Sequence, residues 1–203
     1  EDSRIFFHSF FYYKGDYRVE PMYFPVFMDA CMDKSLLATA RNLYKQQRRW
    51  GWGVENLPYM IFNTAKDWQG LPKGKFVYQI AIQLYGFHSW ATNALIIGLI
   101  GWLPLLLGGD KFNESVLSVN LPAITQNLMT SAMLGMILSA IISTIILPKK
   151  PADFSAWRYL VMLAQWMFLP ISIIIFGSVP GLEAQTRLMF AKYMGFWVTP
   201  KER

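Results

Sequence analysis

The chain has 203 residues, of which 54% are hydrophobic and 16% are charged, so it is more apolar and less charged than a typical soluble domain. Because 16% of the residues are aromatic and Cys31 is the single cysteine, the composition excludes a disordered chain and a disulfide scaffold. The net charge of +6 would suit nucleic acid, but 11 of the 19 basic and 8 of the 13 acidic residues lie in residues 1–75. We therefore attribute the charge to membrane topology and phosphate binding, and expect no nucleic-acid partner.

The first expected element is a strand over Tyr17–Phe24, because YRVEPMYF roughly alternates apolar and polar residues. Gly15 and Asp16 directly before it are typical turn residues. Pro21 and Pro25 restrict the strand to a sheet edge, or bend it, because proline has no N–H to donate to a neighbouring strand.

Two amphipathic helices are expected next. Ser35 can cap the first helix, in which apolar residues recur at helical spacing as far as Trp50. Gly51 and Gly53 are expected to end it. The second stretch, Leu57–Trp68, is expected to form a helix that lies on a membrane surface.

Three later stretches contain no Asp, Glu, Lys or Arg and are 24 to 34 residues long. They are Phe76–Gly109, Ser115–Pro148 and Tyr159–Leu182. Because about 20 apolar residues in a helix cross a hydrocarbon core, they predict three membrane spans. The expected spans are 87–107, 128–147 and 159–177. After them we expect an interfacial helix in which Glu183 and Arg187, four positions apart, form an ion pair.

Basic residues predict the orientation of the spans, because short cytoplasmic loops are enriched in them. Lys66, Lys73 and Lys75 precede the first span, so the segment before it is expected to face the cytoplasm from the plasma (inner) membrane. The loop with Lys111 is expected outside and residues 149–158 inside. Three complete spans would then place the C-terminal tail outside the cell.

The residues that best suit a ligand-binding site lie in YKQQRRWGWG. Gln46, Arg49 and Trp50 stand at i, i+3 and i+4, so they share one helix face. A guanidinium can bond two diphosphate oxygens, an amide can bond a hydroxyl or phosphate, and an indole can stack on a sugar ring. The trio therefore suits a nucleotide-sugar site. The alternative is a basic helix terminus on anionic lipid, with Trp50 as the interface anchor.

Three short motifs carry a family resemblance. QQRRW fits the pattern Q-x-x-R-W at Gln46, Arg49 and Trp50. The initial Glu1-Asp2 resembles the end of a T-E-D motif, and the six residues 196–201, FWVTPK, match F-x-V-T-x-K at all four fixed positions. In this order, interleaved with membrane spans, the motifs resemble those of processive family 2 glycosyltransferases, the cellulose synthase and hyaluronan synthase group. The resemblance covers essentially the whole chain, but only the C-terminal portion of such an enzyme.

The resemblance implies a role for each matched residue. Asp2 would be the catalytic base that takes the proton of the acceptor hydroxyl. Trp50 would form a platform for the acceptor sugar, while Lys201, in a loop that closes over the nucleotide, would meet its phosphates. The implied substrate-binding residues are Gln46, Arg49, Trp50, Thr199 and Lys201. The reaction would be an inverting transfer from a nucleotide sugar, such as a UDP-sugar, to a growing polysaccharide.

The same resemblance implies that half of the active site lies outside this sequence. The family's GT-A core, with its D-x-D motif, precedes the E-D motif, and no D-x-D occurs here. A divalent metal, Mg²⁺ or Mn²⁺, is therefore expected to have its ligands outside this chain, with no metal site within it. At 203 residues the chain is expected to be a piece of the enzyme that is inactive alone.

The expected fold is a mainly α, multi-pass membrane protein with interfacial helices, about three transmembrane helices and a small N-terminal remnant of an α/β GT-A domain. Its expected parts are residues 1–53, the end of the catalytic domain; 54–84, interfacial helices; 85–180, the transmembrane region; and 181–203, an interfacial helix with the gating-loop-like tail. The competing interpretation is a non-enzymatic membrane scaffold or transporter module with a lipid-binding basic helix.

Overall fold

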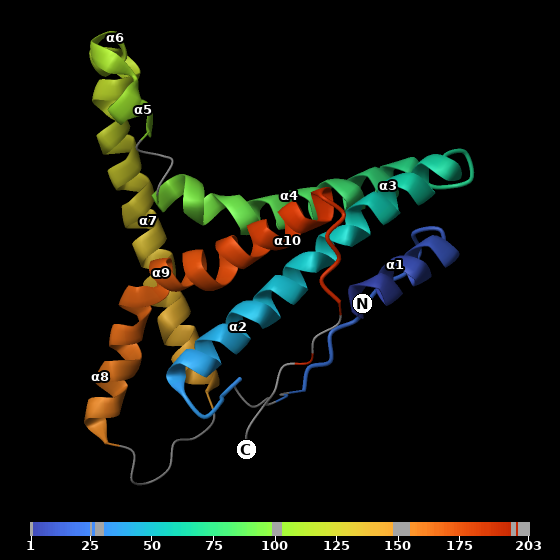
Figure 1. Cartoon of the computed structure of the whole chain (residues 1–203), viewed down its shortest axis with the longest axis horizontal. Coiled ribbons are helices and arrows are strands. Elements are labelled where there is room, and N and C mark those ends of the chain that lie inside the picture. The colour runs from blue at the N-terminus through green and yellow to red at the C-terminus, as the bar shows by residue number, and fades with distance from the viewer. Residues whose placement is uncertain are drawn as a thin grey trace. The chain divides into compact units, whose positions relative to one another are not determined.

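The computed structural model describes residues 2–24, 26, 31–98, 103–147, 155–195 and 198. Within these ranges every regular element is a helix and none is a strand (Figure 1). The expectation of a mainly α protein is therefore confirmed for this part of the chain. The chain separates into two compact units, unit 1 with Glu1–Ala94 and Ile174–Arg203, and unit 2 with Leu95–Ile173.

Unit 1 is built from helices at both ends of the chain. They are α1 (Asp2–Tyr12), α2 (Leu36–Gly51), the 3₁₀ turn η1 (Trp52–Glu55), α3 (Asn56–Lys66), most of α4 (Lys73–Gly98), the π-helical turn η4 (Ile174–Ser178) and α10 (Val179–Met189). The hydrophobic core of unit 1 lies where α1, α3 and the start of α4 meet. Its buried members are Phe7, Phe10, Met60, Leu71 and Phe76.

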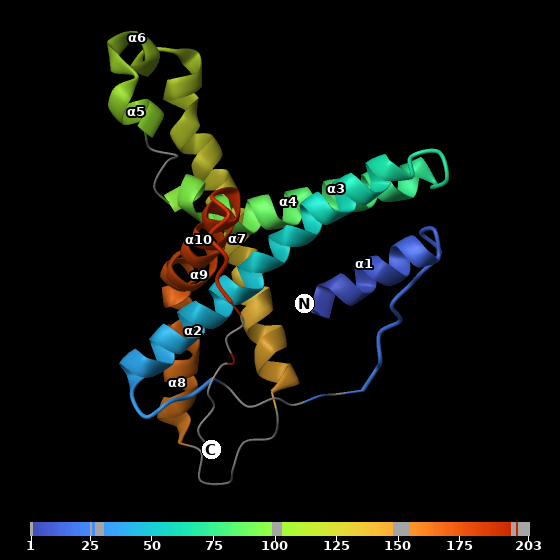
Figure 2. The same cartoon turned by 45° about the vertical axis from the view of Figure 1, so that its right-hand side comes forward.

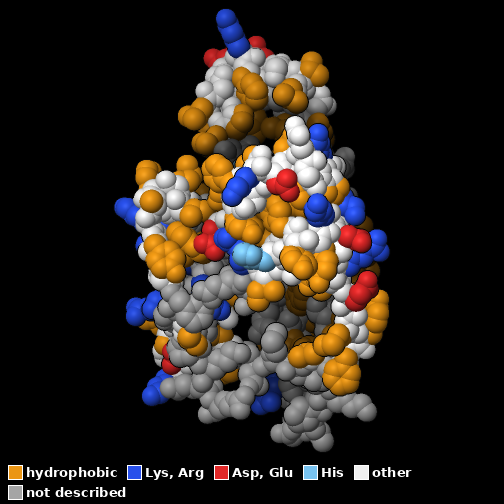
Figure 3. All heavy atoms as spheres, turned by 90° about the vertical axis from the view of Figure 1, so that its right-hand side faces the viewer, with side chains coloured by type: hydrophobic (Ala, Val, Ile, Leu, Met, Phe, Trp, Pro, Cys, Tyr) orange, Lys and Arg blue, Asp and Glu red, His pale blue; other side chains and the backbone are white. Residues whose placement is uncertain are grey.

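Aromatic side chains hold α1 against the start of α4. The rings of Phe10 and Phe11 lie 4.7 and 4.9 Å from the ring of Phe76, which is fully buried. Each phenylalanine buried in this way contributes roughly 1.5–3 kcal/mol. The outer surface at this end of unit 1, formed by α1 and the α3–α4 hairpin, mixes charged with hydrophobic side chains (Figure 3).

The α2 helix begins and ends where the sequence predicts, but the chain does not leave the helical conformation at its end. The Ser35 hydroxyl accepts a hydrogen bond from the N–H of Ala38 at 3.2 Å, which caps the helix. Gly51 keeps right-handed helical backbone angles, and the chain passes through η1 directly into α3. The expected end of the helix at Gly51 is therefore confirmed, although a 3₁₀ turn and not a left-handed glycine follows it, and the expected second helix is confirmed as α3.

The α10 helix packs against both α2 and α4 in unit 1 (Figures 1 and 2). Small residues permit the approach, because Gly181 lies between Gly51 of α2 and Ala91 of α4. Two hydrogen bonds from α10 and the turn before it add to this packing. The Ser178 hydroxyl donates to the carbonyl of Trp90 at 3.1 Å, and Nε2 of Gln185 donates to the carbonyl of Phe87 at 2.8 Å.

Unit 2 contains the short helices α5 (Leu103–Leu107) and α6 (Gly109–Asn113), followed by the long α7 (Val116–Ile146). It also contains α8 (Ala156–Gln165), the 3₁₀ turn η3 (Trp166–Phe168) and α9 (Leu169–Ile173). Through η4 and α10 these last elements continue as one helical stretch that leads from unit 2 into unit 1.

Two helical stretches in the described residues, Val116–Ile146 and Trp157–Met189, are long and apolar enough to cross a membrane. Only 6% of the most apolar 18 residues of the first, and none of those of the second, are buried inside the protein. A helix in the core of a soluble protein would be mostly buried, so these exposed apolar surfaces are suited to contact with lipid. The stretches include the expected spans at 128–147, apart from its last residue, and 159–177.

The expected first span, 87–107, lies partly outside the described residues, because residues 99–102 are not among them. In the described residues α4 ends at Gly98 and α5 begins at Leu103, and α4 lacks an 18-residue stretch apolar enough to qualify. Glutamine, histidine and asparagine side chains along α4 lower its hydropathy, although α4 carries no charge after Lys75. The described part of the chain thus supplies two membrane-crossing candidates, and the first expected span stays a prediction.

The expected strand over Tyr17–Phe24 is also wrong, since this segment has no regular secondary structure. A strand needs a neighbouring strand for its backbone hydrogen bonds, and the described residues contain none. The ring of Tyr17 packs instead on α1, 5.7 Å from the ring of Phe6. The described residues therefore contain no α/β remnant.

Candidate functional site

The predicted trio of site residues lies on the last two turns of α2. Gln46, Arg49 and Trp50 are all within this helix, so their spacing brings them to one face as expected. Trp50 is 52% exposed, while Gln46 and Arg49 are half-buried. An accessible indole beside an amide and a guanidinium is a surface that a sugar ring and its hydroxyls can contact.

A second face of α2 packs against α10. Tyr44, Arg48 and Gly51 are spaced by four and three residues, so they form a stripe along the helix. Because each residue turns the helix by about 100°, this stripe lies roughly opposite the face with Gln46, Arg49 and Trp50. Contact with α10 therefore leaves the predicted site face of α2 turned away from α10.

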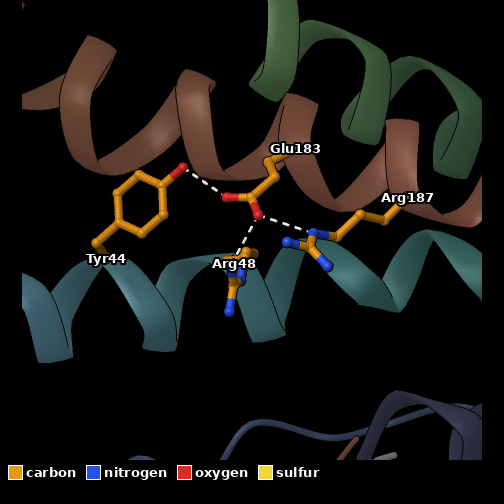
Figure 4. Close-up of polar contacts among 4 residues, drawn as sticks. All are labelled: Tyr44, Arg48, Glu183 and Arg187. Carbon is orange, nitrogen blue, oxygen red and sulfur yellow. Dashed lines mark hydrogen bonds and ion pairs between the residues drawn. The ribbon is translucent and has the colours of Figure 1, made fainter. Parts of the chain in front are cut away.

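A polar cluster joins α2 to α10 around the carboxylate of Glu183 (Figure 4). The Tyr44 hydroxyl donates to its Oε2 at 2.7 Å. Nη1 of Arg48 and Nε of Arg187 donate to its Oε1 at 2.7 and 2.8 Å. The expected Glu183–Arg187 pair is thus confirmed. We call these four residues the Glu183 cluster.

The environment of the cluster changes the acidity of its tyrosine. Burial, together with the hydrogen bond to the Glu183 carboxylate, raises the pKa of Tyr44 from 10.0 to about 12. Both effects favour the neutral phenol, because a buried phenolate is poorly solvated and would face a negative charge. Tyr44 therefore acts as a hydrogen-bond donor to Glu183 throughout the physiological pH range.

The start of α1 is bound to the segment that directly follows α2. Nε of Arg4 donates to Oδ1 of Asn56 at 2.6 Å, and Nδ2 of Asn56 donates to the Ser3 hydroxyl at 2.9 Å. Arg4 also pairs with Glu55 at 3.3 Å. Asp2, the expected catalytic base, is the first residue of α1, so its backbone lies in the helical turn that makes these contacts.

The segment after α10 returns to the same place. The ring of Tyr193 lies 5.8 Å from the ring of Trp52, edge to face, so this segment passes beside η1. The expected loop residues Thr199 and Lys201 lie outside the described residues.

Several residues of this region have no signal in the sequence. Arg4 and Asn56 are 52 positions apart, and Arg48 and Glu183 are 135 apart. Within α2, Arg48 resembles its neighbour Arg49, and only the rotation of the helix assigns one to α10 and the other to the opposite face. The spacing of Glu183 and Arg187 is the one usable signal, because it predicts a pair within a helix.

The described residues offer no candidate metal site. Among them, no group of three His, Cys, Asp or Glu side chains lies close enough together to hold a metal ion. His8 lies on α1 with its ring 5.3 Å from that of Tyr59, and His88 is exposed on α4. The described side chains thus do not supply the donor set that a catalytic Mg²⁺ or Mn²⁺ requires.

Comparison with known proteins adds no relative. No family model matches the chain, and searches of curated proteins and of solved structures found no match.

Proposed function

We propose that the chain is the acceptor-binding and membrane portion of an inverting glycosyltransferase, which transfers a sugar from a nucleotide-sugar donor to a growing polysaccharide. The observation that carries the proposal is a convergence at the turn η1. The start of α1, the end of α2 and the segment after α10 meet there through Asn56, Trp52 and Tyr193. These are the three parts of the chain that contain or lead to the family-like motifs.

In this proposal the acceptor sugar stacks on Trp50, and Gln46 and Arg49 bond the acceptor and the leaving diphosphate. The acceptor hydroxyl attacks the anomeric carbon of the donor and its proton passes to Asp2, while the bond from that carbon to the diphosphate oxygen breaks. Lys201 would neutralise the departing phosphates, with Thr199 beside it. The donor, a UDP-sugar by resemblance, and the divalent metal would be held by residues outside this chain.

Topology supports this arrangement. If α7 and Trp157–Met189, the two candidates among the described residues, are the membrane crossings, they return the chain to its starting side. The tail with Lys201 would then lie on the same side as α2, as a loop that closes over a nucleotide must. Three crossings would separate them. We place this side in the cytoplasm and the membrane at the cell's inner (plasma) membrane, because nucleotide sugars are cytoplasmic and Lys66, Lys73 and Lys75 lie before the spans.

A second function, a membrane scaffold or transporter module, is favoured by the composition of α2. This helix carries Arg41, Lys45, Arg48 and Arg49 and no acidic residue. Leu36 and Leu37 at its start are 90% and 72% exposed. Such a helix can rest on anionic lipid by burying its leucines and pairing its basic residues with phosphates.

Saccharide binding separates the two functions. The chain in neutral-lipid nanodiscs is titrated with glucose and N-acetylglucosamine oligosaccharides while heat and tryptophan fluorescence are recorded. We expect binding that Trp50→Ala weakens by about tenfold, the loss of one ring-stacking contact. Trp68→Ala is the matched control, because Trp68 is similarly exposed, 43% against 52%, but lies in the α3–α4 turn.

Activity is tested in the protein that carries this chain together with its donor-binding domain. There, Asp2→Asn and Trp50→Ala should each abolish polymer formation, and Asp2→Asn should leave saccharide binding intact. A wild-type chain that binds no saccharide, but binds anionic and not neutral vesicles through α2, would establish the scaffold function instead.

A further inference from the structure

The Glu183 cluster fixes both the rotation and the register of α2. Tyr44 and Arg48 are one helical turn apart and bind different oxygens of the same carboxylate, Oε2 and Oε1. If α2 rotated about its axis or slid along α10, at least one of these hydrogen bonds would break. A two-point attachment of this kind is more restrictive than a single ion pair.

Close backbone packing fixes the same interface one turn further along. A Cβ atom on Gly51 would lie 3.1 Å from the Cα of Gly181 and 3.2 Å from the Cβ of Ala184. Gly181 and Ala184 flank Glu183 on α10, so the packed contact and the polar cluster occupy one continuous strip. The strip positions α2 at two points along its axis, Tyr44–Arg48 and Gly51.

The orientation of the opposite face of α2 follows from this strip. Gln46 and Arg49 lie within the segment from Tyr44 to Gly51, and Trp50 directly precedes its last residue. A rigid helix held along one side presents these three side chains in one direction, which reduces the entropy lost when a saccharide binds. α2 itself has no acidic residue, so its Tyr44 and Arg48 bind a carboxylate from another helix, Glu183 of α10.

We propose that Glu183 is a positioning residue for the acceptor site: by holding Tyr44 and Arg48 it orients the face of α2 that carries Gln46, Arg49 and Trp50. This inference rests on the proposed function. Glu183 also lies near the end of the apolar stretch Trp157–Met189. The same contact therefore ties the acceptor face to a helical stretch that is long and apolar enough to cross a membrane.

The charges of the cluster act mainly on orientation. The side chains of Arg48 and Glu183 are 26% and 27% exposed, so water screens part of their attraction. Loss of the pair should change the unfolding temperature little, whereas a change in the direction of Trp50 should weaken acceptor binding directly. The expected signature is therefore a higher KM for the acceptor with a nearly unchanged KM for the donor.

The experiment compares steady-state kinetics of variants in the protein that carries the donor-binding domain. We expect Glu183→Ala and Arg48→Gln each to raise the acceptor KM by about fivefold, a typical coupling for contacting charged groups. Arg187→Gln, which removes a contact within α10 and none to α2, should have a smaller effect. Glu114→Gln, an exposed carboxylate in unit 2, is the control for removal of one negative charge.

A charge exchange tests whether the pair itself matters. The double variant Arg48→Glu with Glu183→Arg should recover part of the acceptor affinity lost in either single variant, because it restores an ion pair between α2 and α10 but not the hydrogen bond from Tyr44. The unfolding temperature of every variant is measured alongside, because a recovery that only follows the unfolding temperature would mean that Glu183 acts through general stability.

The outcomes separate this inference from the proposed function. Wild-type protein that neither transfers sugar nor binds saccharide overturns both. Wild-type activity with an acceptor KM that is the same in Glu183→Ala, Arg48→Gln and wild type overturns the positioning role alone. A fall in unfolding temperature with no selective change in acceptor KM also overturns it, because Glu183 would then be merely structural.

Discussion

Gly51 of α2 and Gly181 of α10 face each other so closely that a Cβ on Gly51 would lie 3.1 Å from the Cα of Gly181. Backbone on the far side cannot move away as a flexible side chain would. We predict that Gly51→Ala destabilises the protein by roughly 1–3 kcal/mol, the usual cost of overpacking. The measurement is thermal unfolding of the chain in nanodiscs.

A matched glycine tests whether the effect comes from the contact. Gly86 lies within α4 and has no atom within 4 Å of the position of an added Cβ. Gly86→Ala should therefore be neutral or stabilise the helix by up to about 1 kcal/mol. Equal unfolding temperatures for Gly51→Ala and Gly86→Ala would contradict the close packing of α2 on α10.

Asn56 links α1 to the end of α2 and is fully buried. Its amide accepts a hydrogen bond from Arg4 and donates one to Ser3. Asn56→Ala removes both hydrogen bonds and leaves Nε of Arg4 without this acceptor. We predict a loss of roughly 1–3 kcal/mol. Limited proteolysis should also cut more readily in residues 13–34, because α1 is held less firmly.

Asn63 supplies the control for this variant. It lies on the same helix, α3, but its side chain donates only to the carbonyl of Tyr59, one turn earlier. Asn63→Ala should therefore leave the proteolysis of residues 13–34 unchanged. If both variants behaved alike, the attachment of α1 through Asn56 would be disproved.

Tyr44 gives a prediction for alkaline pH. Its pKa is raised from 10.0 to about 12 by burial and by Glu183, so the folded state favours the neutral phenol. The stability that this contributes is fully present below pH 10.0 and is lost as the pH rises through about 12. In ultraviolet titrations, the difference between wild type and Tyr44→Phe should contain a phenol that ionises well above pH 10.0.

The same titration reports on Glu183. In Glu183→Ala the hydrogen bond and the negative charge are lost, so the pKa of Tyr44 should fall toward 10.0 while burial still holds it above that value. A Tyr44 phenol that ionises with the other tyrosines in wild type would show that the Glu183 cluster does not form.

Local patterns predicted much of unit 1, because they depend on neighbours in sequence. The Ser35 cap, the helix through Trp50 and the pair of Glu183 with Arg187 all follow from spacings of three or four residues. The end of α2 at Gly51 was predicted, but the role of the glycine there was not, because glycine has two uses. At Gly51 it allows another helix to approach, and it does not adopt the left-handed conformation that would end a helix.

Contacts between distant parts of the chain were beyond prediction for a different reason. Nothing near Arg48 in the sequence indicates that its partner is Glu183, since that pairing depends on how α10 packs on α2. The strand expected at Tyr17–Phe24 failed for a related reason, because alternation favours a strand only where a neighbouring strand exists. The site face of α2 was predictable, whereas the contacts that orient it were not.

Membrane sidedness gives the last prediction. If α7 and Trp157–Met189 each cross the membrane, Lys45 on α2 and Lys201 in the tail lie on the same side. In a Cys31→Ser background, Lys45→Cys and Lys201→Cys should react with a membrane-impermeant thiol reagent in inverted vesicles and stay unreacted in intact cells. A permeant reagent must label both variants, which controls for thiols buried in protein. Labelling of the two cysteines from opposite sides would mean an odd number of crossings, and Lys201 could then not reach a nucleotide held beside Arg49.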